Sequence, residues 1–282
     1  MTDALSIRRR FTNSAMLVSS GVCTVIAVSV LFFILSYLFI KGGASLNFDF
    51  FTKLPAPTGE TGGGMANAIL GSAKVLMLAT CIGVPIGFVA GIYLSEYAGA
   101  AFASIVRFTT DLLNGVPSIV VGIVVYTVVV LKTGLGPLAG GIALGIMMIP
   151  IALRSTEEFL RAVPNSLREG SMALGANKWK TIASVVVPAA IRGIVSGMML
   201  NLARVAGETA PLLLTAGLSM YYNHDWHQPV ATLPVMIYTD ASSPQEDLHQ
   251  QAWAAGFVLL TLVLLVNVVA RTIISRGSHK AR

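Results

Sequence analysis

The sequence predicts an all-α polytopic membrane protein with six transmembrane helices. Three observations lead to this prediction: a low charged fraction, a series of long apolar stretches, and an uneven distribution of basic residues. Of the 282 residues, 55% are hydrophobic and only 11% are charged, and the mean hydropathy is +0.76. A soluble domain carries about twice that charged fraction. Most of this chain is therefore expected to have lipid as its solvent.

Six stretches are long enough to cross the hydrocarbon core of a bilayer, which takes about 20 apolar residues. Five of them contain no charged residue, and the other contains only Arg204 and Glu208. Three arginines precede the first stretch, but that stretch is too long for the core of a signal peptide, so we expect an uncleaved helix. In chain order the predicted spans are 15–40, 75–95, 112–131, 133–153, 193–218 and 250–270.

The basic residues predict that both termini lie in the cytoplasm. With this orientation the cytoplasmic segments hold 14 of the 19 lysines and arginines, and the outside loops hold three. Such an excess is typical of cytoplasmic loops. The basic residues are also too scattered to form a nucleic-acid-binding face, so no nucleic acid partner is expected. The predicted cytoplasmic segments are 1–14, 96–111, 154–192 and 271–282.

The second span carries a stripe of small residues. Gly83, Gly87 and Gly91 recur every four positions, which places them on one face of the helix. A smooth glycine face allows two membrane helices to approach closely. We interpret it as a helix-packing face and not as a substrate groove.

The longest cytoplasmic segment, 154–187, predicts a helical hairpin. Pro164 suits the first turn of a helix, Gly175 suits the left-handed position that ends it, and Asn177 can cap a second helix. Composition alone would also fit a solvated amphipathic hairpin on the membrane surface. The first helix has a narrow face that could lie in a groove of a partner protein. That face consists of Leu167, Gly170, Ser171 and Leu174.

The fifth span contains two charges that we expect near the middle of the membrane. A charged side chain at the centre of a membrane helix costs about 2.5 to 3.5 kcal/mol on insertion scales, so a lipid-facing position is unfavourable. Arg204 and Glu208 are four residues apart and can pair on one face, which Asn201 shares. Pro211 cannot donate to the carbonyl of Gly207, which frees a backbone oxygen nearby. This face is predicted to line an aqueous path, and a structural ion pair between helices is the alternative.

The hairpin resembles the coupling loop of type I ABC importer permeases. Glu169, Gly175, Val185 and Pro188 fit the spacing E-A-A-x-x-x-G-x9-I-x-L-P. Two departures occur: Gly-Ser stands in place of the paired alanines, and valines replace the Ile and Leu. The resemblance implies that ATPase subunits grip this hairpin. The residues it assigns to coupling are Leu167, Glu169, Gly170, Ser171, Leu174 and Gly175.

Three longer phrases extend the resemblance over nearly the whole chain. They are GGGMANAILGS at 62–72, GVPSIVVGI at 115–123 and NLARVAGETAPLLLTAG at 201–217. Together they are similar to the A-type permease subunit of phosphate-specific ABC importers. An arginine in the path favours a passing anion. The residues expected to line that path are Asn201, Arg204, Glu208 and Thr209.

The resemblance also implies a domain division and a set of partners. Residues 1–66 would form an N-terminal transmembrane helix and outer loop, 67–275 a permease core with its coupling loop at 155–187, and 276–282 a cytoplasmic tail. The partners would be a second permease in a pseudo-two-fold heterodimer, two ATP-binding subunits, and a periplasmic or extracellular phosphate-binding protein. The location would be a bacterial inner membrane. The chain has no G-x-x-x-x-G-K-[ST] phosphate loop, so ATP hydrolysis is expected on a partner, and no cofactor is expected here.

Two groups of polar residues outside the path carry weaker signals. His224, Asp225 and His227 could be metal ligands, but a wet outer loop explains them better, and no metal is predicted. The adjacent Glu157 and Glu158 point to different helix faces, and both are interpreted as solvated charges.

Several other functions remain open from the sequence. The same type of permease could carry another oxyanion, such as phosphonate, sulfate or molybdate. A passive anion channel would leave the cytoplasmic hairpin without a role. An intramembrane enzyme using Glu208 would need a second convergent polar group on another span, and none is evident.

Overall fold

Helices make up the regular structure of the described residues, which in this computed structural model are 2–56 and 62–277. Two stretches, η1 and η2, have π-helical hydrogen bonding. No strand is present in the described part of the chain. The elements are α1 (Thr2–Ala44), α2 (Phe48–Thr52), α3 (Ala66–Glu96), α4 (Ala100–Gly115), α5 (Ser118–Val125), η1 (Tyr126–Val130), α6 (Leu131–Thr133), α7 (Pro137–Arg161), α8 (Asn165–Ala173), α9 (Lys178–Thr181), η2 (Ile182–Val186), α10 (Val187–Ala206), α11 (Ala210–Thr215), α12 (Leu233–Ala241) and α13 (Glu246–Gly277).

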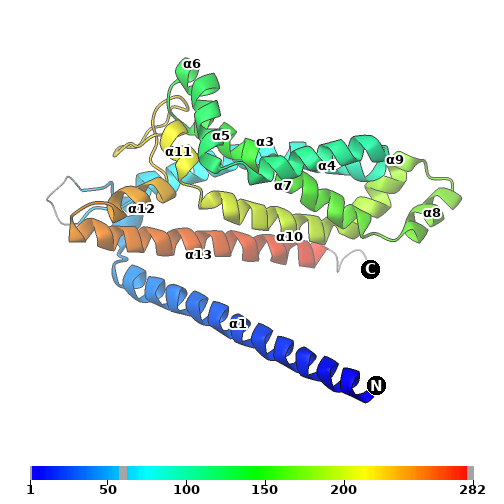
Figure 1. Cartoon of the computed structure of the whole chain (residues 1–282). Helices are drawn as coiled ribbons and strands as arrows, with labels where there is room; N and C mark the ends of the chain where they lie inside the picture. The colour runs from blue at the N-terminus through cyan, green and yellow to red at the C-terminus, as the bar shows by residue number, and fades with distance from the viewer. Residues whose placement is uncertain (1, 57–61, 278–282) are drawn as a thin grey trace.

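The long helices α3, α4, α7, α10 and α13 run along one common direction (Figure 1). Their short connections gather at the two ends of this bundle. Helices α8 and α9 lie at one end, together with the amino end of α1 and the carboxyl end of α13, whereas α2 and α12 lie at the other. Five described helices are long and apolar enough to cross a membrane, and the total is six when one bent pair of helices is counted as a single span. The predicted all-α polytopic architecture is confirmed.

The glycine stripe of α3 packs against α7. A Cβ atom added at Gly83 would lie 2.5 Å from the Cβ of Met148, and one at Gly87 would lie 2.5 Å from the Cβ of Ala152. One turn further along, Gly91 faces Thr156 in the same way. Both helices therefore contribute a residue every four positions to a close contact, as the packing interpretation predicted.

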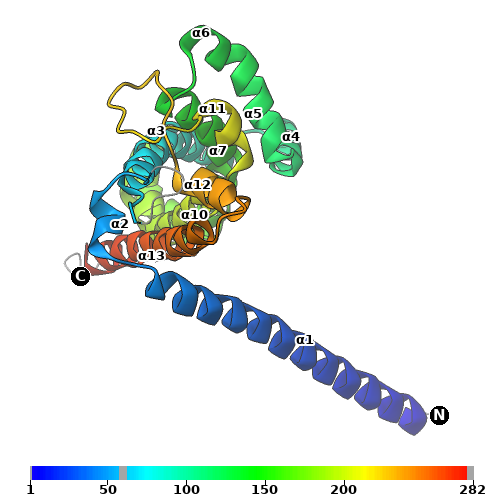
Figure 2. The same cartoon turned by 90° about the vertical axis from the view of Figure 1, so that its left-hand side faces the viewer.

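The third span differs from the continuous helix predicted at 112–131. The chain breaks after Gly115, and the two halves, α4 and α5 with its continuation through Thr133, meet at 95°. Pro117 disfavours helical geometry at the preceding residue, and Val116 is extended (φ −68°, ψ 129°). The second half leaves the bundle sideways (Figures 1 and 2). A proline inside an apolar run thus turns one expected span into a bent pair.

The fifth span also has different limits from the predicted 193–218. The apolar helix runs from Lys178 to Ala206 as one candidate span of 29 residues. It ends at Gly207, and a separate short helix, α11, begins at Ala210. Pro211 lies in the first turn of α11, where a missing N–H is tolerated. Arg204 therefore lies in the last turn of a helix and not at its centre.

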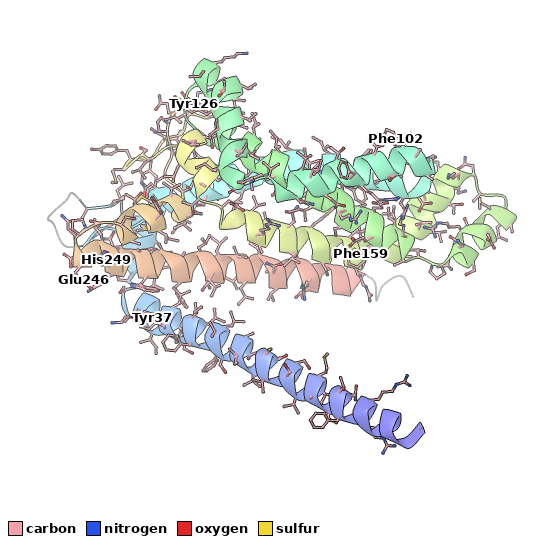
Figure 3. The ribbon with its side chains drawn as sticks, in the orientation of Figure 1. Tyr37, Phe102, Tyr126, Phe159, Glu246 and His249 are labelled. Atoms are coloured by element: carbon pink, nitrogen blue, oxygen red, sulfur yellow. The ribbon has the colours of Figure 1, made fainter. Side chains whose placement is uncertain are left out.

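Helix α1 stands away from the bundle and touches it only near its carboxyl end. There the Tyr37 ring meets the edge of the Trp253 ring of α13, with centroids 5.0 Å apart. Gly42 allows α1 to approach the Trp253 carbonyl and the Phe257 side chain. Along the rest of α1 the side chains project outward (Figure 3), and none of its most apolar window is buried.

The segment between α11 and α12 folds back onto the start of α3. Ser72 Oγ accepts a hydrogen bond from the Leu233 backbone at 2.7 Å, and Lys74 Nζ donates to the Asn223 carbonyl at 2.7 Å. Gly71 lies directly against the carbonyl of Ala231. The lysine near the start of the second span therefore has a defined partner. It fastens the outer connection to α3.

A buried carboxylate in α12 predicts a measurable pH effect. Asp240 is 3% exposed and its Oδ2 has no hydrogen-bond partner among the described residues. Burial raises the pKa of Asp240 from 3.8 to about 6. Because the folded state binds this proton more tightly than the unfolded chain does, the favourable contribution is complete below the unfolded pKa and is lost as pH rises through about 6.

We expect Asp240→Asn to stabilise the detergent-solubilised protein above pH 6 by about 1 to 2 kcal/mol, which is less than the rise in pKa alone corresponds to, because the amide of the variant is also a buried polar group. The thermal unfolding midpoint of the wild type should fall between about pH 4 and pH 6 and level off above that range, and the variant should lose this slope. Asp247→Asn, which removes an exposed carboxylate, is the matched control. Parallel pH profiles for the wild type and Asp240→Asn would contradict the assignment.

Candidate functional site

A cavity of about 300 Å³ lies where the break between α4 and α5 meets the middle of α7 and the end of α10. Its wall combines apolar side chains with a few polar groups. Arg204 and Glu208 are its charged members, and Asn114 and Ser118 are polar groups contributed by the break. The lining residues are Leu113, Asn114, Gly115, Val116, Pro117, Ser118, Val121, Ile146, Met147, Pro150, Ile151, Arg204, Val205 and Glu208.

The cavity lies at mid-depth of the bundle. The residues that α7 contributes, from Ile146 to Ile151, are at the centre of its 25 residues. Asn201, one turn before Arg204, donates from Nδ2 to the Met148 carbonyl at 3.0 Å. This hydrogen bond ties the end of α10 to the middle of α7. Arg204 therefore has the depth expected from the sequence, although it lies at the end of its helix.

The Arg204 guanidinium has no carboxylate partner in the described part of the chain. The ion pair with Glu208 that the spacing allowed does not form, since no contact within 4.0 Å joins them. The physical reason is the end of α10 at Gly207, which destroys the helical register between the two positions. Both side chains line the cavity separately.

The other two expected path residues lie elsewhere. Asn201 is 1% exposed and points into the contact with α7, so it positions α10 and does not line the cavity. Thr209 is the residue before α11 and is half-buried outside the cavity wall. Helix α11 packs against α5 at Gly122, where an added Cβ would come within 2.8 Å of Pro211.

The break in the third span gives the cavity a favourable surface for anions. Helix α5 begins at Ser118, in the cavity wall. The first amides of a helix have no intrahelical acceptor, and the helix dipole is positive at this end. The Gly-Val-Pro-Ser phrase entered the sequence analysis only through the family resemblance and was not placed at the cavity. The proline inside an apolar run was the available signal.

At the end of the bundle that carries α8 and α9, the hairpin has the local structure that the sequence predicted. Helix α8 is followed by Gly175 in the left-handed region, with φ +85°. Asn177 caps α9, since its side chain accepts from the Lys180 backbone at 2.8 Å. No residue of α8 is buried, and the Leu174 side chain is 91% exposed. Ser171 is the residue of the predicted face that contacts the rest of the hairpin, because its hydroxyl lies 2.9 Å from that of Thr181.

Comparison with known proteins identifies the family. A family profile described as "Binding-protein-dependent transport system inner membrane component" matches residues 83–278. The chain belongs to this family of permease components.

Several relatives of this permease carry the same name. This chain is 43% identical to the "Phosphate transport system permease protein PstA" of Yersinia pestis over 274 residues, which cover 96% of this chain and 92% of that protein. The PstA protein of Haemophilus influenzae is 41% identical over 266 residues, covering 93% and 94% of the two chains. PstA 1 of Mycobacterium tuberculosis H37Rv is 36% identical over 278 residues, covering 95% and 89%.

Solved structures share the fold of the permease. A bacterial alginate ABC transporter, solved with an alginate-bound periplasmic protein, superimposes with a TM-score of 0.61 at 16% identity over 96% of each chain. The methionine ABC transporter MetNI, in an inward-facing conformation, gives 0.58 at 19% identity over 75% of this chain and 96% of that chain. These likenesses establish the type I ABC transmembrane fold.

One expectation about the charges of the permease was wrong. Glu158 is solvated, but the Glu157 side chain is only 2% exposed. Arg107 of α4 donates from Nε to Glu157 Oε1 at 2.8 Å, and Arg161 Nε lies 3.1 Å from the same oxygen. Arg154 Nη1 lies 4.0 Å from Oε2. This cluster joins α4 to α7, and only tertiary packing brings Arg107 to the buried carboxylate.

In the described part of the chain, His224, Asp225 and His227 of the outer loop do not come together as a cluster of three ligands. Asp225 Oδ1 accepts a hydrogen bond from the His227 backbone at 3.0 Å, and all three polar residues of this loop, including His224, are exposed. Within residues 2–56 and 62–277, no cluster of three metal-binding side chains occurs.

Proposed function

We propose that this chain is a transmembrane permease subunit of an ATP-driven phosphate importer in a bacterial inner membrane. The observation that carries the proposal is the mid-depth cavity, in which the Arg204 guanidinium has no carboxylate partner among the described residues and the amino end of α5 lies in the same wall. Phosphate is an anion with several acceptor oxygens, and such groups bind to arginine and to helix amino ends. The names of the relatives that are 36–43% identical support phosphate among the oxyanions.

The chain would form half of the translocation pathway. A phosphate ion entering the cavity would accept hydrogen bonds from Arg204, while the separate carboxylate of Glu208 would limit how tightly the anion is held. Transient binding suits transport, since the substrate must also leave. A second permease would complete the pathway in a pseudo-two-fold pair, and a binding protein would deliver phosphate from outside.

Coupling to ATP would occur at α8 and the turn that follows it. The exposed face of α8 would dock on one of two ATP-binding subunits, with Glu169 and Gly170 beside the exposed Leu167 and Leu174. The chain itself has no phosphate loop and would not hydrolyse ATP. A passive anion channel would not explain a side chain as exposed and apolar as that of Leu174, the residue that ends α8.

Reconstitution of the complex of two permeases and two ATPase subunits, with the binding protein, tests this function. Radiolabelled phosphate should enter proteoliposomes only when ATP and the binding protein are both present. When radiolabelled sulfate, molybdate or phosphonate is supplied in place of phosphate, the proteoliposomes should not accumulate it. Uptake that continues without ATP would favour the channel, and accumulation of another oxyanion in preference to phosphate would reassign the substrate.

A further inference from the structure

One largely buried guanidinium joins helix α8 to the ends of two transmembrane helices. No residue of α8 is buried, so apolar packing does not anchor it. Ser171 contacts Thr181 at the start of the fifth span, and Arg168, in the middle of α8, reaches the ends of α3 and α7 with a side chain that is only 17% exposed. The guanidinium has five N–H donors in a fixed planar arrangement. Its hydrogen bonds account for all three of its nitrogen atoms.

The partners of Arg168 come from two different transmembrane helices. Its Nε and Nη2 form a fork with the carboxylate of Glu96, at 3.3 and 2.7 Å, and Glu96 is the last residue of α3. Nη2 also donates to the Leu160 carbonyl at 2.8 Å, and Nη1 donates to the Val163 carbonyl at 2.6 Å. Carbonyls in the last turn of a helix lack intrahelical donors. Arg168 therefore caps the end of α7 while it pairs with the end of α3.

The Glu96 carboxylate is well suited to this pairing. Its side chain is 6% exposed, and the forked arrangement of two donors on one carboxylate is both stronger and more directional than a single contact. Lys178, the first residue of the fifth span, donates to the backbone carbonyl of Glu96, and its ammonium lies 4.5 Å from the centre of the Tyr97 ring. The end of α3 is therefore the place where both arms of the hairpin are fastened.

We propose that Arg168 and Glu96 are positioning residues that make α8 move as a rigid body with α3 and α7. The proposal rests on the proposed function, in which an ATPase subunit docks on α8. If α8 were not anchored, a movement of the docked ATPase subunit could displace α8 without moving the transmembrane helices α3 and α7. The Arg168 fork removes this freedom, so a displacement of α8 is transmitted to α3 and α7. Helix α7 carries the wall of the cavity, and α3 is packed against it along the glycine stripe.

The first test measures phosphate transported per ATP hydrolysed by the reconstituted complex. Arg168→Lys keeps the charge but has three donors on a single atom and cannot form the fork. We expect it to lower this ratio by about five- to tenfold, within the range by which coupled sites affect one another. Glu96→Gln should give a similar loss. The double variant should be no worse than the more severe single variant, because each change breaks the same interaction.

The controls separate coupling from assembly. The ATPase subunit should co-purify with Arg168→Lys as with the wild type, whereas failure of the wild type to retain it would overturn the proposed function itself. Arg161→Lys changes a nearby, half-exposed arginine whose ion pair with Glu157 lies within α7, and the ratio of this variant should stay near that of the wild type. An unchanged ratio in Arg168→Lys, or additive losses in the double variant, would overturn the rigid-body proposal.

A second test uses the intact fork and does not depend on the folding of a variant at Arg168. Nitroxide labels at Ser166 of α8 and Val89 of α3, both exposed positions, would be placed in a background with Cys23→Ser and Cys81→Ser. The distance between the labels in the complete complex should be the same without nucleotide and in the ATP-bound state. A shift of about 5 Å, one helical turn, between these states would show that α8 slides independently and would overturn the proposal.

Discussion

Replacement of Arg204 by glutamine is expected to reduce ATP-driven phosphate uptake by about ten- to hundredfold, which corresponds to the loss of one hydrogen bond to a charged group. The guanidinium lines the mid-depth cavity and has no carboxylate partner in the described residues, so removal of its charge leaves no buried carboxylate unpaired. The complex should therefore assemble normally. Uptake into proteoliposomes, normalised to the amount of complex, is the measurement.

Two comparisons sharpen the Arg204 experiment. Arg204→Lys retains a positive charge in the cavity without the forked geometry, and it should keep more uptake than Arg204→Gln. Lys132→Gln removes a basic residue from an exposed position on α6 and should leave uptake unchanged. Wild-type uptake in a correctly assembled Arg204→Gln complex would remove the cavity from the pathway.

Gly175→Val is expected to abolish stable association of the ATPase subunit. Gly175 has φ +85°, a conformation that L residues adopt only with strain and that β-branched residues avoid. No atom lies within 4 Å of an added Cβ, so the effect comes from the backbone and not from a clash. The turn would have to change its geometry, which re-aims α8 and the exposed Leu174. Co-purification with a tagged ATPase subunit measures the loss.

Matched substitutions distinguish backbone strain from a general effect of larger side chains. Asparagine tolerates the left-handed region, so Gly175→Asn should retain most of the association. Gly99→Val introduces the same side chain at another glycine with open space around it but an ordinary φ of −67°, and it should have no effect. Normal retention of the ATPase by Gly175→Val would show that the turn does not determine docking.

Phosphate selectivity can be assigned only in part to the cavity. Arg204 and the amino end of α5 would attract any oxyanion of similar size, because they offer donors without a shape that excludes other anions. The preference for phosphate is expected to come mainly from the binding protein. The permease would then contribute passage and coupling, which explains why its cavity contains so few polar groups.

The limits of prediction follow from particular elements. The helix that became α8, its ending at Gly175 and the cap at Asn177 were all predicted correctly, because turns and caps depend on residues a few positions apart. The break at Pro117 could have been recognised from its own residue type, but its angle and its meeting with Arg204 could not. The pairing of Arg204 with Glu208 failed because it assumed a helix that continues through Gly207.

By itself, the sequence determined that this is a helical membrane protein with about six spans and an exposed hairpin, because lipid demands long apolar runs and local hydrogen bonding sets helix ends. Only the tertiary structure decided which polar groups meet. Arg107 reaches Glu157 across 50 positions and Arg168 reaches Glu96 across 72. Such distant partners are brought together by the packing of whole helices. The pattern of residues near either partner does not encode this packing. The cavity beside Arg204 has the same origin, since three separate spans supply its wall.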